Sequence, residues 1–255
     1  MDFTLTKYIS ILEAAETANY NIGSVSDLFS GKLKSPYVVL RHDVDRKPQN
    51  SLAMARAEAE RGIRSSYYFR SVKASFVPKI IDGIRDLGHE IGYHYEDWYL
   101  ARYDKEKAIA LFEGNLARLR ASGPVSTICM HGSPLARDNN MTIWDHWDFK
   151  DHGVEDCILS FDYTGHSFFT DSGRTFGVSS ANLRDELGSA DVYPEICTTE
   201  DLCHFLATKK TDKIMISCHP ERWSNKTMNW SSQFLKDKEI NIIKLAIKKS
   251  RSLKS

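Results

Sequence analysis

Apolar residues in this sequence follow two spacings, one typical of amphipathic helices and one typical of buried strands. In residues 105–121 the apolar side chains recur every three or four positions, and so they share one helix face. Residues 37–40 are a short unbroken apolar run, as in a strand that is buried on both faces. By the same criteria we expect helices over 4–20, 48–61, 77–87, 105–121, 199–208 and 232–250. We expect strands over 37–40, 65–69, 90–95, 126–130 and 213–217.

The order of these elements predicts the fold class. From residue 37 to residue 130 strands and helices alternate, which is typical of a parallel sheet with helices outside it. The middle third is less regular, and there we expect strands over 157–162 and 190–193 with glycine-containing turns between them. We therefore expect a single domain over residues 1–255. It would be an α/β protein, a distorted or incomplete (β/α) barrel of about seven parallel strands, with an N-terminal helix, 1–35, packing on the barrel.

Composition and charge are those of an ordinary soluble globular protein. Of the 255 residues, 42% are hydrophobic and 27% are charged, and 34 basic side chains balance 34 acidic ones. This balance gives no overall field that would attract nucleic acid or an anionic membrane. The basic stretch 236–254 is more simply explained as the end of a solvated helix than as a binding patch. No apolar run is long enough to span a bilayer.

The cysteines and the first residues of the sequence predict the cellular compartment of the protein. The five cysteines are odd in number and form no Cys-x-x-Cys pair, which argues against a disulfide framework or a structural zinc site. The first residues lack the basic segment and apolar core of a secretory signal. We therefore expect a cytoplasmic protein with free thiols.

Four histidines each lie at or just after the end of an expected strand. They are His42, His94, His131 and His219, and each is flanked by other groups with useful chemistry. In a barrel of alternating strands and helices, the carboxyl ends of the strands meet at one mouth, where active sites lie. Residues between 42 and 219 could therefore share one pocket.

The first of these strand ends carries two carboxylates. On extended backbone Asp43 and Asp45 point to the same side, which suits one metal ligand and one general base. The alternative is a surface turn in which Asp45 lies near the N-cap of the next helix. His94 and Glu96 also share one strand face, and imidazole and carboxylate both bind zinc-like cations. Alone, such a histidine would more often be structural.

Further candidates lie in the irregular third of the chain and after the last strand. Asp171 or Asp162 could orient a histidine, and Arg174 could bind an anionic group. Residues 170–174 fit an Asp-Ser-Gly turn equally well. Trp223 could stack on a sugar face, although core packing is the simpler explanation for a single tryptophan.

These motifs resemble those of a known family. Residues 88–94, Gly-His-Glu-Ile-Gly-Tyr-His, are similar to the second motif of the polysaccharide deacetylases, the NodB-homology proteins of carbohydrate esterase family 4. Residues 41–45 resemble the first motif of that family, and residues 216–219 resemble the last. The resemblance covers residues 36–224. The combination of motifs is similar to a divergent branch that is associated with surface polysaccharide or O-antigen biosynthesis.

The resemblance implies a NodB-like barrel with a metal-dependent deacetylase activity. The substrate would be an N-acetyl or O-acetyl group on a sugar intermediate, linked to a nucleotide or a lipid. The implied cofactor is a divalent metal, zinc first, with cobalt, manganese or nickel as alternatives. The implied roles are metal binding by Asp45 and His94, with His131 as third ligand, and proton transfer by Asp43 and His219, with Asp171 or Asp162 orienting His219. To these we add expected substrate contacts by Ser133, Arg174 and Trp223.

The chain departs from the family pattern at several positions. Val44 separates two acids that are adjacent in the family, and Trp98 stands where the family has its second metal-binding histidine. His131 lies in a replaced third motif and is the first choice for the third ligand, with Glu96 second. Two other functions stay open: hydrolysis of another non-peptide C–N bond, and carbohydrate binding without catalysis. The expected partner is an acetylated saccharide and not nucleic acid, and the oligomeric state is open.

Overall fold

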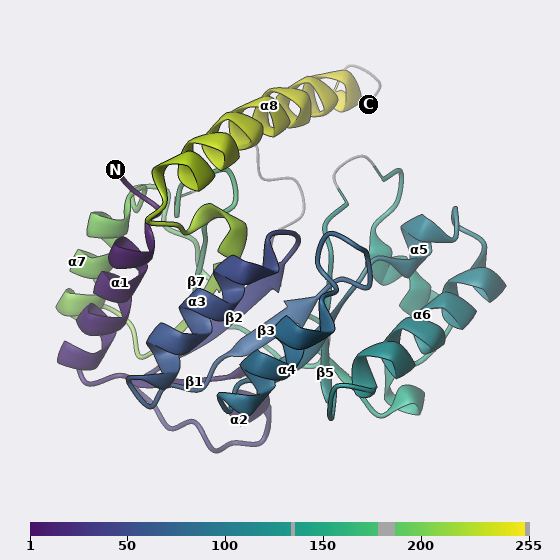
Figure 1. The fold of residues 1–255 in the computed structure, drawn as a ribbon, viewed down its shortest axis with the longest axis horizontal. Helices are drawn as coiled ribbons and strands as arrows, with labels where there is room; N and C mark the ends of the chain where they lie inside the picture. Colours follow the sequence, from purple (N-terminus) through teal and green to yellow (C-terminus); the bar gives the residue numbers. More distant parts are fainter. Residues whose placement is uncertain (134–135, 178–186, 253–255) are drawn as a thin grey trace.

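A curled parallel sheet forms the centre of the molecule, and helices surround it (Figure 1). The computed structural model describes residues 1–133, 136–177 and 187–252. Within them seven strands follow the order β6-β5-β4-β3-β2-β8-β7, β1 pairs with the first part of β2, and these pairings are parallel. The strands are β1 (Asn21–Gly23), β2 (Tyr37–Val44), β3 (Ser66–Phe69), β4 (Glu90–Tyr95), β5 (Thr127–Met130), β6 (Glu155–Asp156), β7 (Ser167–Thr170) and β8 (Lys213–Cys218). The expected incomplete barrel is confirmed.

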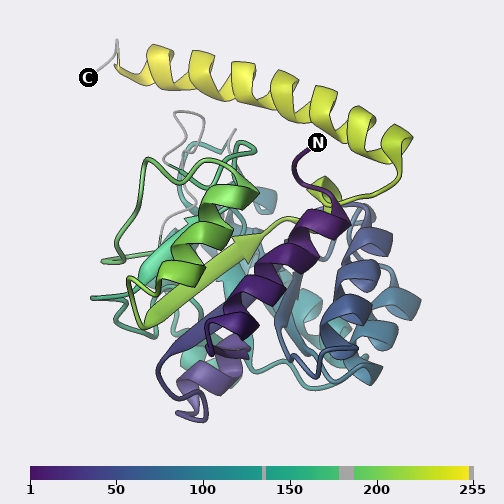
Figure 2. The same ribbon diagram turned by 90° about the vertical axis from the view of Figure 1, so that its left-hand side faces the viewer.

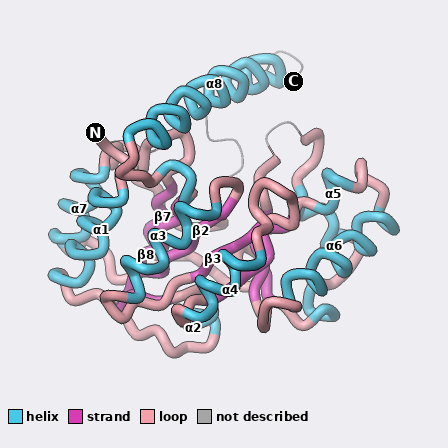
Figure 3. The backbone as a smooth tube through the Cα atoms, in the orientation of Figure 1, coloured by secondary structure: helices cyan, strands magenta, loops and turns pink. Residues whose placement is uncertain are grey.

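Helices cover the outside of the sheet and one end of the barrel. Figure 1 shows α1 and α7 on one side and α5 and α6 on the other, and Figure 2 shows α8 crossing above the barrel. Figure 3 shows loops below α8 on both sides of the view, at the ends of the strands. The helices are α1 (Leu5–Thr17), α2 (Val25–Phe29), α3 (Pro48–Ala59), α4 (Pro78–Asp86), α5 (Asp97–Leu100), α6 (Lys105–Arg120), α7 (Thr199–Thr208) and α8 (Thr227–Ser252), with 3₁₀ turns η1 (Asn140–Asp145), η2 (Phe149–His152) and η3 (Pro220–Arg222). Among the described residues no helix combines the length and apolarity needed to cross a bilayer.

Side chains on β2 alternate between the barrel interior and the surrounding helices. Val39 packs inside the barrel with Tyr68 of β3 and Met215 of β8. Val38 and Leu40 face outward and belong to the core beneath α1 and α7. This two-residue period decides which of the polar residues that follow can reach the barrel mouth.

The second strand is longer than the apolar run that predicts it. β2 continues through Val44, so three ionisable residues lie inside a strand that is buried along its whole length. Each of them has a partner: Arg41 pairs with Asp43, and His42 pairs with Glu58 of α3. Burial of charged groups is tolerated when they are paired, and so the strand does not stop at the first polar residue.

The N-terminal segment is not the single helix that we expected. α1 ends at Thr17, and Asn19 adopts a left-handed conformation with φ of 56°. The chain then adds the short strand β1 to the sheet before α2 begins. Ser24 caps α2 through a reciprocal capping box with Asp27. These local signals divide the segment into three elements.

The irregular third also differs from expectation. Residues 157–162 are not a strand, because the carboxylate of Asp156 accepts hydrogen bonds from the backbone N–H groups of Ile158 and Leu159 and turns the chain. Of residues 190–193, Asp191 alone makes a strand-like bridge, to Ser167. Instead, β7 pairs with β8 and completes the described sheet at that end.

Candidate active site

A cavity of about 350 Å³ opens at the carboxyl ends of the strands. Asp43 and Asp45 both line it, which confirms that they lie on one side of the chain. Three of the four strand-end histidines line it as well: His94, His131 and His219. These side chains come from segments spread over most of the sequence, as expected for a barrel mouth.

The fourth histidine, His42, belongs to a different environment. It points outward from β2, and its Nε2 atom lies 2.7 Å from the Glu58 carboxylate. Glu58 also accepts hydrogen bonds from Tyr67 and Ser65, and His89 lies beside it. His42 therefore lies outside the pocket of the other three histidines, because adjacent residues of a strand face opposite sides.

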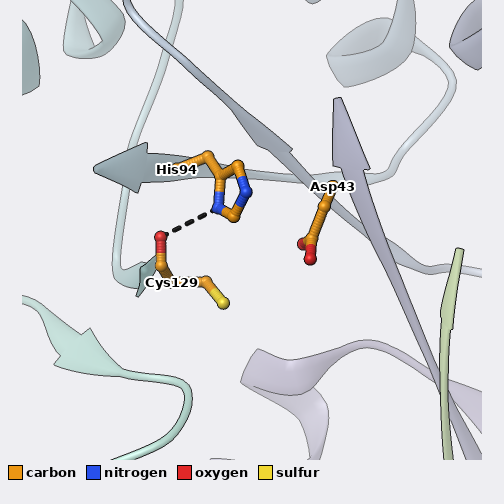
Figure 4. Close-up of side chains that lie close together, drawn as sticks. All are labelled: Asp43, His94 and Cys129. Carbon is orange, nitrogen blue, oxygen red and sulfur yellow. Dashed lines mark hydrogen bonds between the residues drawn. The ribbon is translucent and has the colours of Figure 1, made fainter. Parts of the chain in front are cut away.

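His94 is held in the orientation that suits a metal ligand. Its Nδ1 atom donates a hydrogen bond to the carbonyl oxygen of Cys129 at 3.0 Å, as Figure 4 shows. A carbonyl oxygen can only accept, so Nδ1 carries the proton and Nε2 presents its lone pair to the cavity. Burial lowers the pKa of His94 to about 4, which keeps the imidazole neutral at neutral pH.

Three potential ligand atoms converge in front of His94. The Asp45 Oδ1 atom lies 3.0 Å from His131 Nδ1 and 3.6 Å from His94 Nε2. The two ring nitrogens are 3.2 Å apart. Burial opposes ionisation of Asp45, but His131 and His94 outweigh it and lower the pKa of this carboxyl well below its usual range. A carboxylate and two imidazoles thus lie within bonding reach of one common point.

A second set of close ligand atoms is less suitable for a metal. It consists of Asp43, His94 and Cys129, drawn in Figure 4. Burial raises the pKa of the Cys129 thiol well above its usual value, and a protonated thiol is a poor ligand. Asp43 already accepts two hydrogen bonds from Arg41, at 3.1 and 2.7 Å. We therefore assign the candidate metal centre to the Asp45 set.

Asp43 is fixed beside that centre by a charged neighbour. Arg41 approaches it in a fork, with Nε on one carboxylate oxygen and Nη2 on the other, and the Ser217 hydroxyl lies 3.4 Å from the second oxygen. Such two-point contacts fix both the position and the plane of a carboxylate. Arg41 lies two residues before Asp43 in the sequence and therefore on the same strand face. The resemblance to the family's first motif assigns no role to it.

His219 and Asp171 form a hydrogen-bonded pair. The His219 Nδ1 atom donates to Asp171 Oδ1 at 2.6 Å, and the backbone N–H of His219 donates to Oδ2 at 2.9 Å. Asp171 also accepts hydrogen bonds from Arg222 and from the Trp223 indole, each at 2.7 Å. Burial opposes ionisation, but Arg222 and His219 lower the pKa of Asp171 to about 2. Asp171 is therefore an anion at neutral pH, and it holds the His219 ring through Nδ1. The second nitrogen of that ring is Nε2.

The loop that carries His131 depends on a residue that the sequence did not single out. Asn140 is fully buried, and its amide donates to the His131 carbonyl oxygen at 2.7 Å and to the Ser133 hydroxyl at 3.0 Å. The backbone N–H of His131 continues the strand pairing by donating to Tyr95 at 2.8 Å. Ser133 lines the cavity. No local sequence signal distinguishes Asn140, because its partners belong to a different segment.

Glu96, the alternative third ligand, has another partner. Its two carboxylate oxygens accept hydrogen bonds from Arg70 at 2.7 and 2.8 Å. Both residues line the cavity, but Glu96 lies outside the set of converging ligand atoms. Trp98, at the family's histidine position, is 6% exposed and packs with Tyr103. The structure therefore favours His131 over Glu96.

Two expected substrate contacts and one alternative acid lie away from the cavity lining. Trp223 is 1% exposed and stacks edge-on with Phe3, so it cannot stack on a sugar without unpacking the core. Arg174 pairs with Asp237 of α8 at 2.9 Å and lies over aromatic rings. Asp162 instead bonds a neighbouring threonine and serine at the surface. The sequence alone did not indicate whether Asp171 or Asp162 orients His219.

One wall of the cavity comes from an element that we did not connect with it. Ile240, Ile243 and Ile247 of α8 line the cavity beside the polar residues of the strand ends. Their spacing of three and four places them on one helix face. The apolar spacing predicts this helix, but it does not indicate where the helix lies relative to the barrel.

Comparisons with known proteins found likenesses among solved structures. No family model and no curated protein matches the chain. A wild-type carbohydrate esterase family 4 pseudoenzyme from Bacillus anthracis is 14% identical with a TM-score of 0.44, over 79% of this chain and 60% of that one. A mutant peptidoglycan deacetylase from Bacillus subtilis is 8% identical with a TM-score of 0.43, over 85% and 93% of the two chains.

A family 4 carbohydrate esterase from Streptomyces lividans, in complex with acetate, is 13% identical with a TM-score of 0.42. That match covers 90% of each chain, whereas this chain spans 60% of the length of the Bacillus anthracis protein. The likeness to these three structures is distant, because each is at most 14% identical with a TM-score below 0.5.

Proposed function

We propose that this chain is a metal-dependent deacetylase that hydrolyses an N-acetyl or O-acetyl group on a sugar. One observation carries the proposal: the converging Asp45, His94 and His131 atoms line the same cavity as His219, which is hydrogen-bonded to the buried Asp171. A set of metal ligands beside an acid–base pair is the arrangement that metal-assisted hydrolysis requires.

The three side chains fit a zinc-like cation. In a tetrahedral site with bonds of about 2.0–2.1 Å, neighbouring ligand atoms are about 3.3 Å apart. The three distances among these atoms are 3.0, 3.2 and 3.6 Å. Asp45 Oδ1 is buried and accepts no well-aligned hydrogen bond, although one nitrogen of His94 and one of His131 lie near it. A cation would satisfy this atom.

Each remaining group has a role that its contacts support. When bound, the metal would supply Lewis acidity toward a carbonyl oxygen and a water of lowered pKa. Asp43, held by Arg41, accepts the proton of the attacking water at its carboxylate. His219 donates a proton from Nε2 to the departing amine or alcohol, while Asp171 fixes Nδ1 and stabilises the positive ring. Ser133 contacts the substrate at the cavity wall.

The biological substrate is a saccharide intermediate of surface polysaccharide or O-antigen biosynthesis. This part of the proposal rests on the resemblance of the strand-end motifs. A cytoplasmic location, with the sugar linked to a nucleotide or a lipid carrier, accompanies it. Zinc is the proposed metal, with cobalt, manganese and nickel as alternatives.

The test measures metal content and acetate release on the same variants. We expect the purified chain to bind one divalent ion and to release acetate from N- or O-acetylated sugars. His94→Ala and His131→Ala should lose both properties, because each removes one of three ligands. His204→Ala, on the exposed surface of α7, is the matched control and should keep both.

Each alternative outcome identifies another function. Tight metal binding that persists in His94→Ala and in His131→Ala would contradict the proposed site. Sugar affinity without metal and without acetate release would indicate a carbohydrate-binding protein. Turnover of cyclic amides, but not of acetylated sugars, under added zinc, cobalt or manganese would indicate a hydrolase of another C–N bond.

A further inference from the structure

The last helix, α8, is anchored to the barrel mainly through its first half. It spans 26 residues and is therefore about 39 Å long. Trp230 donates to the Asp2 carbonyl oxygen at 2.7 Å, and Asp237 pairs with Arg174 at 2.9 Å. Figures 1 and 2 show the second half continuing across the top of the molecule. The helix thus presents a long face that does not pack on the barrel.

Large apolar side chains cover that outward face. Met228, Leu235 and Ile242 follow one another at seven-residue intervals, and they are 88%, 61% and 68% exposed. Leu245 lies near the same line and is 43% exposed. A recurring apolar stripe on one exposed helix indicates a surface that meets a partner less polar than water.

The charge of α8 differs from that of the chain as a whole. Residues 227–252 contain six basic side chains and two acidic ones, whereas the complete chain is balanced. One of the two acids, Asp237, is buried against Arg174. Of the basic residues, Lys236, Lys238 and Lys249 are exposed beside the apolar stripe. The second acid, Glu239, is exposed as well, so the outward surface of the helix combines apolar side chains with a net positive charge.

We infer that α8 docks on the surface of an anionic lipid bilayer. An amphipathic helix with leucine and isoleucine on one face and lysines beside them lies in the headgroup region, where burial of the apolar stripe and attraction to anionic lipids act together. A second copy of the chain fits less well, because two cationic helices would repel each other. Nucleic acid would use the lysines but leave the apolar stripe in water.

Docking would bring the cavity close to the bilayer. Ile240, Ile243 and Ile247, on an adjoining face of the same helix, form one wall of the cavity. This arrangement suits a saccharide that is carried on a membrane lipid, a conclusion that rests also on the proposed function. The docking itself does not depend on the chemistry of the site.

The test is co-sedimentation of the full chain with lipid vesicles. We expect binding to vesicles of equimolar phosphatidylcholine and phosphatidylglycerol, weaker binding as salt is added, and little binding to phosphatidylcholine alone. The double variant Leu235→Ser/Ile242→Ser should bind roughly tenfold more weakly or worse. Leu111→Ser/Leu159→Ser removes two leucines that are 40% and 48% exposed elsewhere, and should bind as the unmodified chain does.

Three results would overturn the inference. One is equal binding of the unmodified chain to both kinds of vesicle, or to neither. Another is equal loss of binding in the two double variants. The third is a dimer in solution that Leu235→Ser/Ile242→Ser dissociates, without vesicle binding, which would make the stripe a protein interface. Metal content and acetate release from a soluble sugar should be unchanged in both double variants, so failure of docking and failure of the proposed function are distinguishable.

Discussion

At the scale of single residues, the candidate site depends on the partners of each side chain as much as on its identity. His94 and His219 are both strand-end histidines, but one donates from Nδ1 to a neutral carbonyl oxygen and the other to a carboxylate. Burial lowers the pKa of His94 and keeps it neutral, and the carbonyl fixes the tautomer in which Nε2 can act as a ligand. The anionic Asp171 favours the protonated ring of His219, which suits an acid.

The Asp171–His219 pair gives the first prediction at this scale. In Asp171→Asn the imidazolium form of His219 loses its anionic neighbour, because Asp171, with a pKa of about 2, is ionised at neutral pH. We expect turnover to fall by roughly 10²–10⁴-fold and the basic limb of the pH–rate profile to move to lower pH. Steady-state kinetics over a pH range measures both effects.

Asp162→Asn is the control for this prediction. Asp162 bonds Thr164 and Ser189 at the surface, so its loss should leave the profile unchanged. Metal content of Asp171→Asn should also stay unchanged, since Asp171 is not among the converging ligand atoms. A lower rate with an unshifted pH profile would indicate that Asp171 supports only the fold.

At the scale of elements, buried polar contacts tie the helices to the strand ends. Asp97, the first residue of α5, accepts hydrogen bonds from Tyr93 of β4 and from Asn115 of α6. Three elements, β4, α5 and α6, therefore meet at one carboxyl group. Burial is the main cause that raises the pKa of Asp97 to about 6.

This junction predicts a pH-dependent stability. The folded chain holds the Asp97 proton up to about pH 6, whereas the unfolded chain releases it near the ordinary aspartate pKa of 3.8. The contribution of Asp97 is therefore fully present below the unfolded pKa and is lost as pH rises through the folded pKa. The loss is roughly 3 kcal/mol in total.

Urea unfolding of the unmodified chain and of Asp97→Asn, at pH values on either side of this window, measures the effect. Asparagine cannot ionise, so the stability of the unmodified chain relative to the variant should decrease as pH rises through the window. A difference between the two proteins that does not change with pH would contradict the raised pKa.

At the scale of the whole molecule, the candidate metal centre joins segments that are distant in the chain. Its ligands come from the ends of β2, β4 and β5, three strands within one sheet. A cation bound there would connect these strands in the folded state and would have no equivalent site in the unfolded chain. Metal binding should therefore raise the stability of the whole barrel.

Thermal unfolding with and without zinc measures this coupling. A metal at one hundred times its dissociation constant adds about 2.7 kcal/mol, and a chelator should remove that gain. His131→Ala should unfold at the same temperature with zinc and with chelator, since it lacks the third ligand. A zinc-induced rise that His131→Ala retains would locate the metal elsewhere.

The sequence by itself determined the alternation of strands and helices, and with it the parallel barrel. Periodicity is a local property, so 105–121 and 90–95 were readable without knowledge of their neighbours. The position of His94 and His219 at strand ends was also local information, and so was the shared side of Asp43 and Asp45. Charged residues inside β2 and the short strands of the irregular third were not predictable, because their partners lie elsewhere in the chain.

Tertiary structure alone decided which of the candidates belong together. It brought His131 to Asp45 and His94, separated Glu96 from them through Arg70, and turned Trp223 into the core. It also placed α8 across the barrel mouth. Such choices depend on contacts between residues far apart in sequence, and the free energy of those contacts exists only when the whole chain is packed.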